Sequence, residues 1–387
     1  MRYVIVGGGI AGVSACEVIR KKDPKGEIVL IDAEEHPLYS RVLLGAYLVG
    51  KIPREKIFLK TESWYEEQKI EWLRGLHVTA LDSINHHVAL SDGREISYNK
   101  LLLASGCQPR LLGEDLRGVS YLRTLDDADH LLQLLREQEN NTCGFIYGGG
   151  FIACEYLWIF YHHHISTTIA FRGPWFWSKV LDAQSGGMIE KWLQKNGVRV
   201  VPAVSIQKLL GQETLEGIET GEQIWESTLL GVGIGTTPEL HWIKEAGVQT
   251  QEGICVDTRM KTNIPDIYAA GDIAEVKDQI SGRSLVARTW TNAVLQGRIA
   301  GANMIGGSET FETVSSYSMS ILGLDAVFIG DTSRKAAEEI IVEGTQEVGI
   351  AQHFIRGGRI VGATLVGRSQ ERSPLTKAIQ EKKKELL

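Results

Sequence analysis

Three glycines near the N-terminus have the spacing of a phosphate-binding turn. Gly7, Gly9 and Gly12 follow an apolar run and open a helical pattern. One glycine permits the tight turn, one lets the backbone approach a pyrophosphate, and one allows close packing of the helix on the sheet. The N-terminus of that helix offers oriented N–H groups to the phosphate. Asp32 lies 20 residues beyond Gly12, where a carboxylate can accept hydrogen bonds from an adenosine ribose. The segment therefore predicts a dinucleotide site.

A second turn of the same kind occurs later in the chain, as Gly148-Gly149-Gly150-Phe151-Ile152-Ala153. Alanine in the third position of the motif still permits fairly close packing. We take Gly148, Gly150, Phe151 and Ile152 as candidate contacts of a second dinucleotide.

Each turn joins an apolar strand to a helix, as a βαβ unit requires. Expected elements of the first unit are a strand over 3–6, a helix over 10–21 and a strand over 27–31, and those of the second are a strand over 144–147, a helix over 152–161 and a strand over 166–171.

Two further segments resemble each other, residues 101–109 and 229–238. Each is an apolar strand followed by a turn with the pattern small-x-Gly-x-x-Pro, in which x is any residue. We interpret each as the last strand of a dinucleotide unit, where the chain crosses to the other domain. Ala104 and Gly106 in the first copy, and Gly235 in the second, are thus candidate lining residues.

The segment from Thr262 to Asp272, TNIPDIYAAGD, resembles the second FAD fingerprint of the pyridine-nucleotide-dependent flavoprotein reductases. The resemblance implies that the Asp272 carboxylate bonds the ribityl chain and that the turn at Gly271 meets the flavin pyrophosphate. It also implies that FAD, rather than NAD, is the ligand of the first unit, and that NAD(P)H is the ligand of the second.

This resemblance extends over nearly the whole chain and implies an α/β fold of the glutathione-reductase type. Two Rossmann-like domains are expected, with the NAD(P) domain inserted in the FAD domain and a small α+β domain at the C-terminus. The expected boundaries are 1–112 and 240–312 for the FAD domain, 113–239 for the NAD(P) domain and 313–387 for the C-terminal domain. In the last of these we expect strands over 316–330 and 350–368 and a helix over 332–340.

Within this superfamily the chain is similar to the flavin module of the NADH-nitrite reductase large subunit and to the rubredoxin and ferredoxin reductases. Residues 39–44, YSRVLL, resemble the nitrite-reductase form of a stretch that passes the flavin. Gly45 stands where the rubredoxin-reductase-like enzymes place a lysine near flavin N5. Arg41 is then either a contact of the pyrophosphate or flavin, or a surface arginine. The resemblance also implies that the Val78 backbone meets adenine and that Trp290 borders the isoalloxazine.

The second site has one expected element and lacks another. Glu155 matches the family's glutamate near the nicotinamide. Phe171, however, stands where the family's NADH sites have Glu or Asp, and a phenyl ring cannot accept hydrogen bonds from ribose hydroxyls. Arg172 could instead meet a 2′-phosphate and favour NADPH, or be a solvated loop residue. The aromatic loop over residues 173–177 could stack on adenine, dock a partner protein or pack beneath the domain.

Several other classes of function are disfavoured. The net charge of −7 and the lack of a basic stripe argue against nucleic acid as a partner. None of the five cysteines forms a CxxC or CxxxxC pair, so no disulfide relay or iron–sulfur cluster is expected. The run His162–His164 points in three directions on a helix, which disfavours a metal site. The absence of a signal peptide or an apolar segment of membrane length suggests a cytoplasmic protein.

The sequence therefore predicts an FAD-dependent oxidoreductase in which a nicotinamide nucleotide gives a hydride to the flavin and electrons pass to an external acceptor. That acceptor would be a redox protein or a metal-centre subunit, and the chain could form a homodimer or a hetero-oligomer. The alternative is a flavin subunit of a larger metalloenzyme, for example of the aldehyde oxidoreductase type, with an altered or unused nicotinamide site. An FAD monooxygenase is less favoured, since no oxygenation signature is evident.

Overall fold

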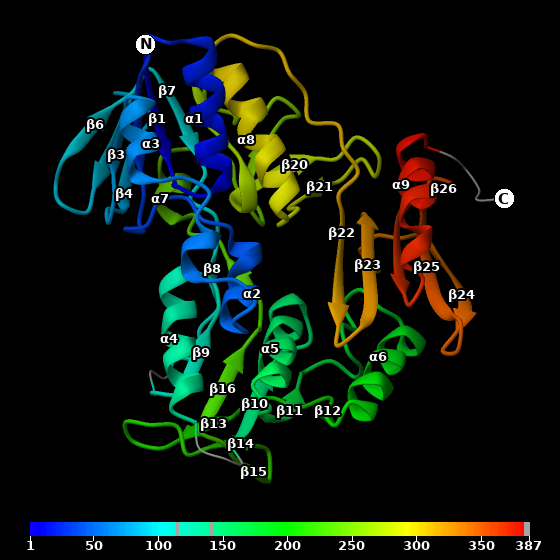
Figure 1. Ribbon diagram of the computed structural model, residues 1–387. Helices are drawn as coiled ribbons and strands as arrows, with labels where there is room; N and C mark the ends of the chain where they lie inside the picture. Colours follow the sequence, from blue (N-terminus) through cyan, green and yellow to red (C-terminus); the bar gives the residue numbers. More distant parts are fainter. Residues whose placement is uncertain (114–115, 139–141, 383–387) are drawn as a thin grey trace. The chain divides into compact units, whose positions relative to one another are not determined.

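The structure, a computed structural model, describes residues 1–113, 116–138 and 142–382, and the chain divides into two compact units (Figure 1). Unit 1 consists of Met1–Val42, Arg54–Gln108 and Thr237–Ser315. Unit 2 consists of Leu43–Pro53, Pro109–Thr236 and Ser316–Leu387, and its residues 114–115, 139–141 and 383–387 lie outside the described part. The boundaries of the three domains expected from the sequence remain a prediction.

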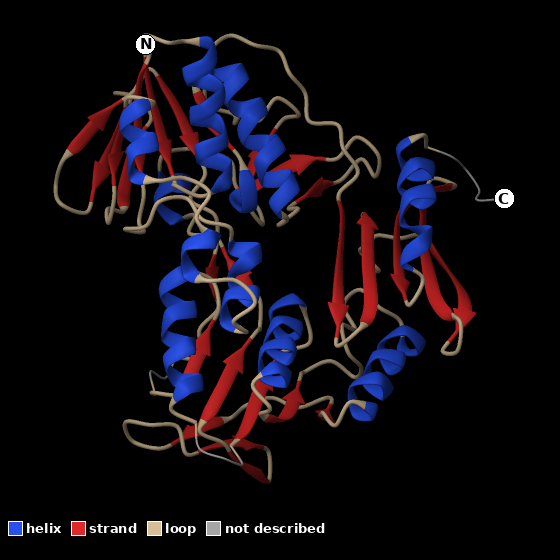
Figure 2. Ribbon diagram, in the orientation of Figure 1, coloured by secondary structure: helices blue, strands red, loops and turns tan. Residues whose placement is uncertain are grey.

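Unit 1 is built on a parallel five-stranded sheet in the order β19-β7-β1-β2-β3. Its strands are β1 (Arg2–Val6), β2 (Glu27–Ile31), β3 (Ile70–Leu73), β7 (Lys100–Leu103) and β19 (Ile267–Ala269). Most of these strands are continuous apolar runs, as in a sheet that is buried on both faces, and Figure 2 shows helices beside them. Both strands expected in the first βαβ unit are present.

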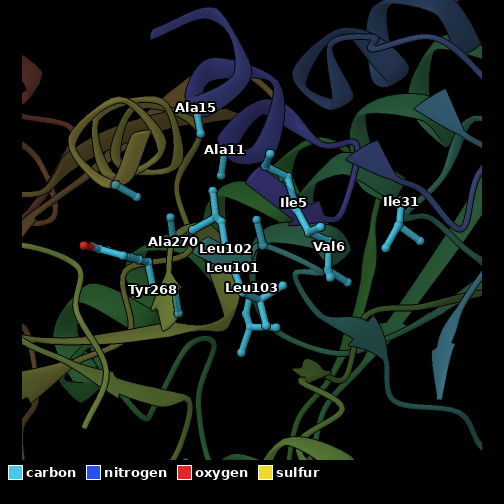
Figure 3. Packing of buried hydrophobic residues seen from close by; sticks show 14 of the residues in the cluster. Ile5, Val6, Ala11, Ala15, Ile31, Leu101, Leu102, Leu103, Tyr268 and Ala270 are labelled. Carbon is cyan, nitrogen blue, oxygen red and sulfur yellow. The ribbon is translucent and has the colours of Figure 1, made fainter. Parts of the chain in front are cut away.

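Two helices lie side by side against this sheet, α1 (Ile10–Lys22) and α8 (Trp290–Met304) (Figure 1). They approach so closely that a Cβ on Gly297 would overlap the carbonyl of Ala11, and one on Gly301 would lie 2.8 Å from the carbonyl oxygen of Ala15. Figure 3 shows Ala11 and Ala15 above the buried side chains of β1 and β7. Glycines thus let α8 hold α1, and the turn that precedes α1, in place.

Two smaller sheets complete unit 1, one of β4, β5 and β6 and one of β18, β20 and β21. The remaining elements of unit 1 are η2 (Arg54–Ile57), α3 (Glu62–Glu67), β4 (Val78–Asp82), β5 (His87–Leu90), β6 (Glu95–Ser97), α7 (His241–Glu245), β18 (Ile254–Val256), η3 (Gly271–Ile273), β20 (Ala274–Lys277) and β21 (Ser284–Leu285). Three short elements lie where the chain passes between the units: η1 (Arg41–Leu43), β8 (Gln108–Pro109) and β17 (Thr236–Thr237).

Unit 2 repeats the plan of unit 1 with a parallel sheet in the order β12-β11-β10-β16-β9. Its strands are β9 (Val119–Tyr121), β10 (Cys143–Tyr147), β11 (Ser166–Ala170), β12 (Arg199–Val201) and β16 (Leu229–Val232), and its helices are α2 (Leu44–Leu48), α4 (Leu125–Arg136), α5 (Phe151–His162) and α6 (Ala183–Lys195). A three-stranded sheet of β13 (Lys208–Leu210), β14 (Gly217–Thr220) and β15 (Gln223–Glu226) precedes β16. The predicted second βαβ unit is confirmed, and β10 and β1 occupy equivalent central places.

The C-terminal part of unit 2 is an antiparallel sheet in the order β22-β23-β26-β25-β24, with one helix, α9 (Arg372–Gln380), and a short turn, η4 (Ser369–Glu371). The strands are β22 (Ser316–Ile321), β23 (Leu324–Gly330), β24 (Glu339–Thr345), β25 (Gly349–Arg356) and β26 (Arg359–Val366). The helix expected over 332–340 is wrong. Residues 334–336 form a turn, and the chain then enters β24, which pairs with β25 along its whole length. Long-range pairing outweighs the local helical preference of this segment.

Candidate nucleotide-binding sites

The first glycine turn forms an open cradle at the N-terminus of α1. Gly7 has a φ of 112°, and a Cβ there would overlap the carbonyl of Ala104. A Cβ on Gly12 would overlap the carbonyl of Gly7, so both positions require glycine. Gly9, by contrast, is the N-cap of the helix and has no atom within 4 Å of the place where a Cβ would stand. Backbone atoms therefore fill the side of the turn at Gly7 and Gly12, whereas the side at Gly9 is open, as a bound pyrophosphate requires.

Asp32 follows β2 and lies against this turn. Its carboxylate is so close to Gly8 that any side chain there would overlap it, and the residue is 8% exposed. Burial, reinforced by the neighbouring charge of Glu34, raises the pKa of Asp32 to about 6. Gly8 was not among the predicted site residues, although it lies in a run of three consecutive glycines. Glycine at this position is what lets the Asp32 carboxylate, predicted to bind the ribose, lie against the turn.

Arg41 belongs to a closed ring of hydrogen bonds. Its Nη2 lies 2.5 Å from Oε1 of Glu34, its Nη1 donates to the Tyr39 hydroxyl at 2.9 Å, and that hydroxyl donates to Oε2 of Glu34 at 2.6 Å. Its positive charge also acts to lower the pKa of Asp32. The guanidinium is therefore placed beside the adenosine end of the predicted site. Glu34 was not among the predicted site residues, and Tyr39 was noted only as part of the segment 39–44, because the sequence does not show that both bond Arg41.

The predicted FAD fingerprint closes around the same turn. Gly271, at a φ of 82°, would place a Cβ 3.0 Å from Cβ of Ala11, and its N–H donates to Oε1 of Gln296 at 2.8 Å. Asp272 is the middle residue of the 3-10 turn η3, and its carbonyl accepts from the Cys107 thiol at 3.3 Å. The structure thus brings the two segments of the FAD prediction together at one end of α1.

Four other predicted residues hold different positions in unit 1. Ala104 follows β7 and forms the floor beneath Gly7, and Gly106, two residues later, has a φ of 73°. Val78 is a buried residue at the start of β4, and Trp290 is half-buried at the first position of α8. Contacts of these residues with a ligand remain predictions.

The second cradle repeats the first in its backbone. Gly148 has a φ of 140°, and a Cβ there would overlap the carbonyl of Gly233. In the same way, a Cβ on Gly7 would overlap the carbonyl of Ala104. Gly150 is the N-cap of α5, and it and Gly235 have open space where a Cβ would stand. Ala153 is fully buried, in contact with Gly233. Unit 2 therefore also offers a helix N-terminus that is open to a phosphate.

The two cradles differ at the position predicted to meet the ribose. Phe171 takes the place of Asp32: a Cβ on Gly149 would lie 3.3 Å from the Phe171 Cβ and Cγ, which mirrors the contact between Gly8 and Asp32. The Phe171 ring is 3% exposed and packs edge-on against Phe176, with centroids 5.5 Å apart. This side of the second site therefore presents hydrocarbon instead of a hydrogen-bond acceptor, with the exposed Arg172 next along the chain.

The aromatic loop after Arg172 packs within unit 2. Phe176 is fully buried and Trp177 is 9% exposed. The indole N–H of Trp175 donates to the Leu181 carbonyl at 2.9 Å. Of the three interpretations left open by the sequence, packing beneath the domain accounts for these side chains.

Phe151, the first residue of α5, lies in an aromatic cluster with Trp177, Tyr317 and Phe328. The ring of Tyr317 stacks on that of Phe328, and burial raises the pKa of the Tyr317 hydroxyl. Phe151 nonetheless remains 38% exposed, although three aromatic rings contact it. Ile152 follows it on the helix and is half-buried. The C-terminal sheet thus supplies aromatic side chains to the N-terminus of α5, which the sequence did not reveal.

Glu155 lies five residues into α5 and faces helix α2. A Cβ on Gly45 would lie 2.7 Å from its Oε2 and 3.0 Å from the ring of Trp158. Burial raises the pKa of Glu155. Glu155 and Gly45, which lie far apart in the sequence, are therefore neighbours within unit 2.

Cysteines and histidines are the other side chains that could form a disulfide or bind a metal. All five cysteines lie in the described residues and are free thiols. A ring nitrogen of His162 lies 2.9 Å from the Trp158 carbonyl oxygen. A ring nitrogen of His163 lies 2.8 Å from the Leu48 carbonyl oxygen. Within residues 1–113, 116–138 and 142–382, no group of three acidic, histidine or cysteine residues could hold a metal, and no helix has the length and apolarity to cross a bilayer.

The chain is similar in sequence to three oxidoreductases and in structure to a fourth protein. An NADH oxidase of Methanocaldococcus jannaschii is 29% identical over 95% of this chain and 88% of that protein. A rubredoxin-NAD(+) reductase of Pseudomonas putida is 31% identical over 85% of this chain and 86% of that protein. A nitrite reductase [NAD(P)H] of Bacillus subtilis is 29% identical over 98% of this chain, which spans only 47% of that protein. The putidaredoxin reductase–putidaredoxin covalent complex superposes with a TM-score of 0.91, at 26% identity over 98% of this chain and 93% of that one.

The family model described as pyridine nucleotide-disulphide oxidoreductase matches residues 1–297. That range contains both glycine cradles and the Gly271-Asp272 turn, so the resemblance predicted from the sequence is confirmed. Together with the fold, this match shows that the chain belongs to the pyridine nucleotide-disulphide oxidoreductase family.

Proposed function

We propose that this chain takes electrons from a nicotinamide nucleotide onto FAD and passes them to an acceptor outside the chain. The observation that carries the proposal is the pair of glycine cradles, which share one backbone plan in two units while every cysteine is a free thiol. Two dinucleotides can thus be held, but no disulfide is present to receive the electrons. The named relatives include reductases of rubredoxin and an NADH oxidase, which agrees with an external acceptor.

The residues of unit 1 fit FAD. The α1 N-terminus and the open space over Gly9 suit the pyrophosphate, and Asp32 suits the adenosine ribose. Gly271 and Asp272 stand at the same end of α1, where the ribityl chain would follow. Once bound, FAD would supply the hydride-accepting and electron-donating chemistry, while the protein supplies binding, orientation and electrostatics.

A count of electrons tests this proposal. The FAD-loaded protein, titrated with dithionite under anaerobic conditions, should take up two electrons per flavin. A family member with a redox-active disulfide would take up four, because the disulfide accepts a further pair. Uptake of four electrons would contradict the proposal that electrons leave the flavin directly for an external acceptor.

For the second site we propose a preference for NADPH over NADH. Phe171 removes the acceptor that would bond the ribose 2′-hydroxyl, and the exposed Arg172 supplies a cation beside it. A 2′-phosphate could pair with that guanidinium in a bidentate manner. Binding of NADPH and NADH to the wild type and to Arg172→Ala tests the assignment. The variant should lose affinity for NADPH by about tenfold and keep its affinity for NADH. Equal losses for both nucleotides would contradict it.

The second candidate function is a flavin subunit of a larger metalloenzyme whose nicotinamide site is altered or unused. The buried phenyl ring of Phe171 favours it, and so does the nitrite reductase relative, in which this chain corresponds to under half of the protein. The packed aromatic loop gives it no further support, since Phe176 and Trp177 are buried within the unit. Failure of both NADH and NADPH to bind would favour this candidate over the first.

A further inference from the structure

Two buried side chains hold the turn formed by Gly271 and Asp272. The Gly271 N–H donates to Oε1 of Gln296 at 2.8 Å, and the Asp272 carbonyl accepts from the Cys107 thiol at 3.3 Å. Gln296 is 1% exposed and Cys107 is 3% exposed, so water has little access to either side chain. The first bond fixes the peptide group that enters Gly271, and the second fixes the peptide group that leaves Asp272. The two residues of the turn are therefore bracketed by hydrogen bonds to side chains.

Gln296 belongs to the helix that also packs against the first glycine cradle. It lies on α8 directly before Gly297, where a Cβ would overlap the carbonyl of Ala11 on α1. The turn lies against both helices, since a Cβ on Gly271 would lie 3.0 Å from that of Ala11 and 3.9 Å from that of Ala293. Helix α8 therefore fixes the turn relative to the N-terminal end of α1.

The segment that follows β7 holds the same turn from another direction. The Ala270 N–H donates to the carbonyl of Leu103, the last residue of β7, at 3.1 Å. The chain then passes Gly106, which has a φ of 73°, and the next residue is Cys107, whose thiol reaches the Asp272 carbonyl. A backbone bond therefore holds the start of the turn, and a thiol holds its end.

These bonds matter for the direction of the Asp272 side chain. The φ of 82° at Gly271 is left-handed, and glycine leaves the backbone free to rotate unless other bonds restrain it. We propose that Gln296 and Cys107 are positioning residues for FAD, which aim the Asp272 carboxylate at the ribityl chain. The inference rests on the proposed binding of FAD by unit 1. A carboxylate that is already aimed needs no further ordering when the cofactor binds, which raises the affinity.

Competition between FAD and ADP for the full-length apoprotein tests the inference. ADP carries the adenosine and the pyrophosphate that suit the first cradle, but it lacks the ribityl chain. It is titrated as a competitor of FAD, so that only its occupancy of the FAD site is measured. Cys107→Ala and Gln296→Met should each weaken FAD binding by about tenfold, because loss of one bond loosens the contact between Asp272 and the ribityl chain. Both variants should leave the competing affinity of ADP unchanged.

Three further variants separate positioning from a general loosening of the site. Cys107→Ser keeps an O–H donor and should restore the affinity for FAD. Cys143→Ala removes an exposed thiol of unit 2 and should behave as the wild type. In an Asp272→Ala background, Cys107→Ala should cause no further loss, because both changes remove the same contact.

The possible results distinguish the inference from the proposed function. Equal losses of FAD and ADP affinity in both variants would overturn the inference alone, since the side chains would then support the whole cradle. Unchanged FAD affinity, or a loss that adds to that of Asp272→Ala, would overturn it as well. Chemical denaturation checks the fold of each variant, and the Cys107 series decides the outcome if Gln296→Met does not fold. Failure of the wild type to bind FAD would overturn the proposed function, and the inference with it.

Discussion

Replacing Asp32 with asparagine should stabilise the apoprotein while weakening its binding of FAD. Asp32 is 8% exposed and lies against the glycine turn, and the pKa of its carboxyl is raised from 3.8 to about 6, chiefly by burial. A carboxyl whose pKa is higher in the folded than in the unfolded chain destabilises the fold once it is ionised. The cost begins as the pH rises above about 4 and is complete above about 6. A shift of about two pKa units corresponds to about 3 kcal/mol at neutral pH.

The assay is thermal unfolding of the apoprotein at pH 4.5 and at pH 8, for the wild type and Asp32→Asn. The variant should unfold several degrees higher than the wild type at pH 8 and at nearly the same temperature at pH 4.5. Its affinity for FAD should fall by about tenfold or more at pH 8, because a charged acceptor of the ribose hydrogen bonds is lost. Asp92→Asn is the control: that carboxylate is exposed, and hydrogen bonding from the Arg94 N–H lowers its pKa, so its loss should raise stability at neither pH.

Lower stability of Asp32→Asn at pH 8 would refute this reasoning. So would a stabilisation of equal size at both pH values, since the effect would then not come from ionisation. Confirmation would show that the fold tolerates an unfavourable carboxylate in order to bind the cofactor.

Three further predictions concern the cradles and the helix that supports the first of them. Gly7→Ala should destabilise unit 1 by about 2 kcal/mol or more, because Gly7 has a positive φ and a Cβ there would overlap the Ala104 carbonyl. Gly9→Ala should leave the unfolding transition unchanged and weaken FAD binding. Chemical denaturation measures the first effect, and FAD titration measures the second. Phe171→Asp should raise the affinity for NADH relative to NADPH by about tenfold, measured by equilibrium titration, and an unchanged ratio would contradict the assigned ribose position. Gly297→Val should cost about 1–3 kcal/mol by forcing α8 away from Ala11, and a denaturation midpoint equal to that of the wild type would contradict the close packing of the two helices.

Features that depend on local backbone geometry, such as the two glycine turns, could be predicted from the sequence. The spacing of Gly7, Gly9 and Gly12 predicted the first cradle, and Asp32 stands against it as the ribose rule requires. The second cradle followed from the same pattern, down to the anomaly at Phe171. Such turns are readable because glycine is required wherever the backbone is left-handed or closely approached.

What the sequence could not show depends on segments far apart in the chain. Nothing near Gly45 indicates that it faces Glu155, and nothing near Phe151 indicates that Tyr317 packs on it. The fate of the aromatic loop was open for the same reason, because Trp177 packs against Phe328 of the C-terminal sheet, about 150 residues further along the chain. The expected helix over 332–340 was wrong for the same reason, because pairing with β25 makes the chain a strand, β24, from Glu339 onward.

Anaerobic titration of the FAD-loaded protein with NADPH and with NADH tests the central claim most directly. At least one of the two nucleotides should bleach the oxidised flavin band rapidly, and NADPH should do so at the lower concentration. Addition of an external one-electron acceptor should then restore the band, whether or not the accessible thiols have been alkylated. A flavin band that neither nucleotide bleaches would contradict the account, since the second cradle would then not deliver electrons to the first.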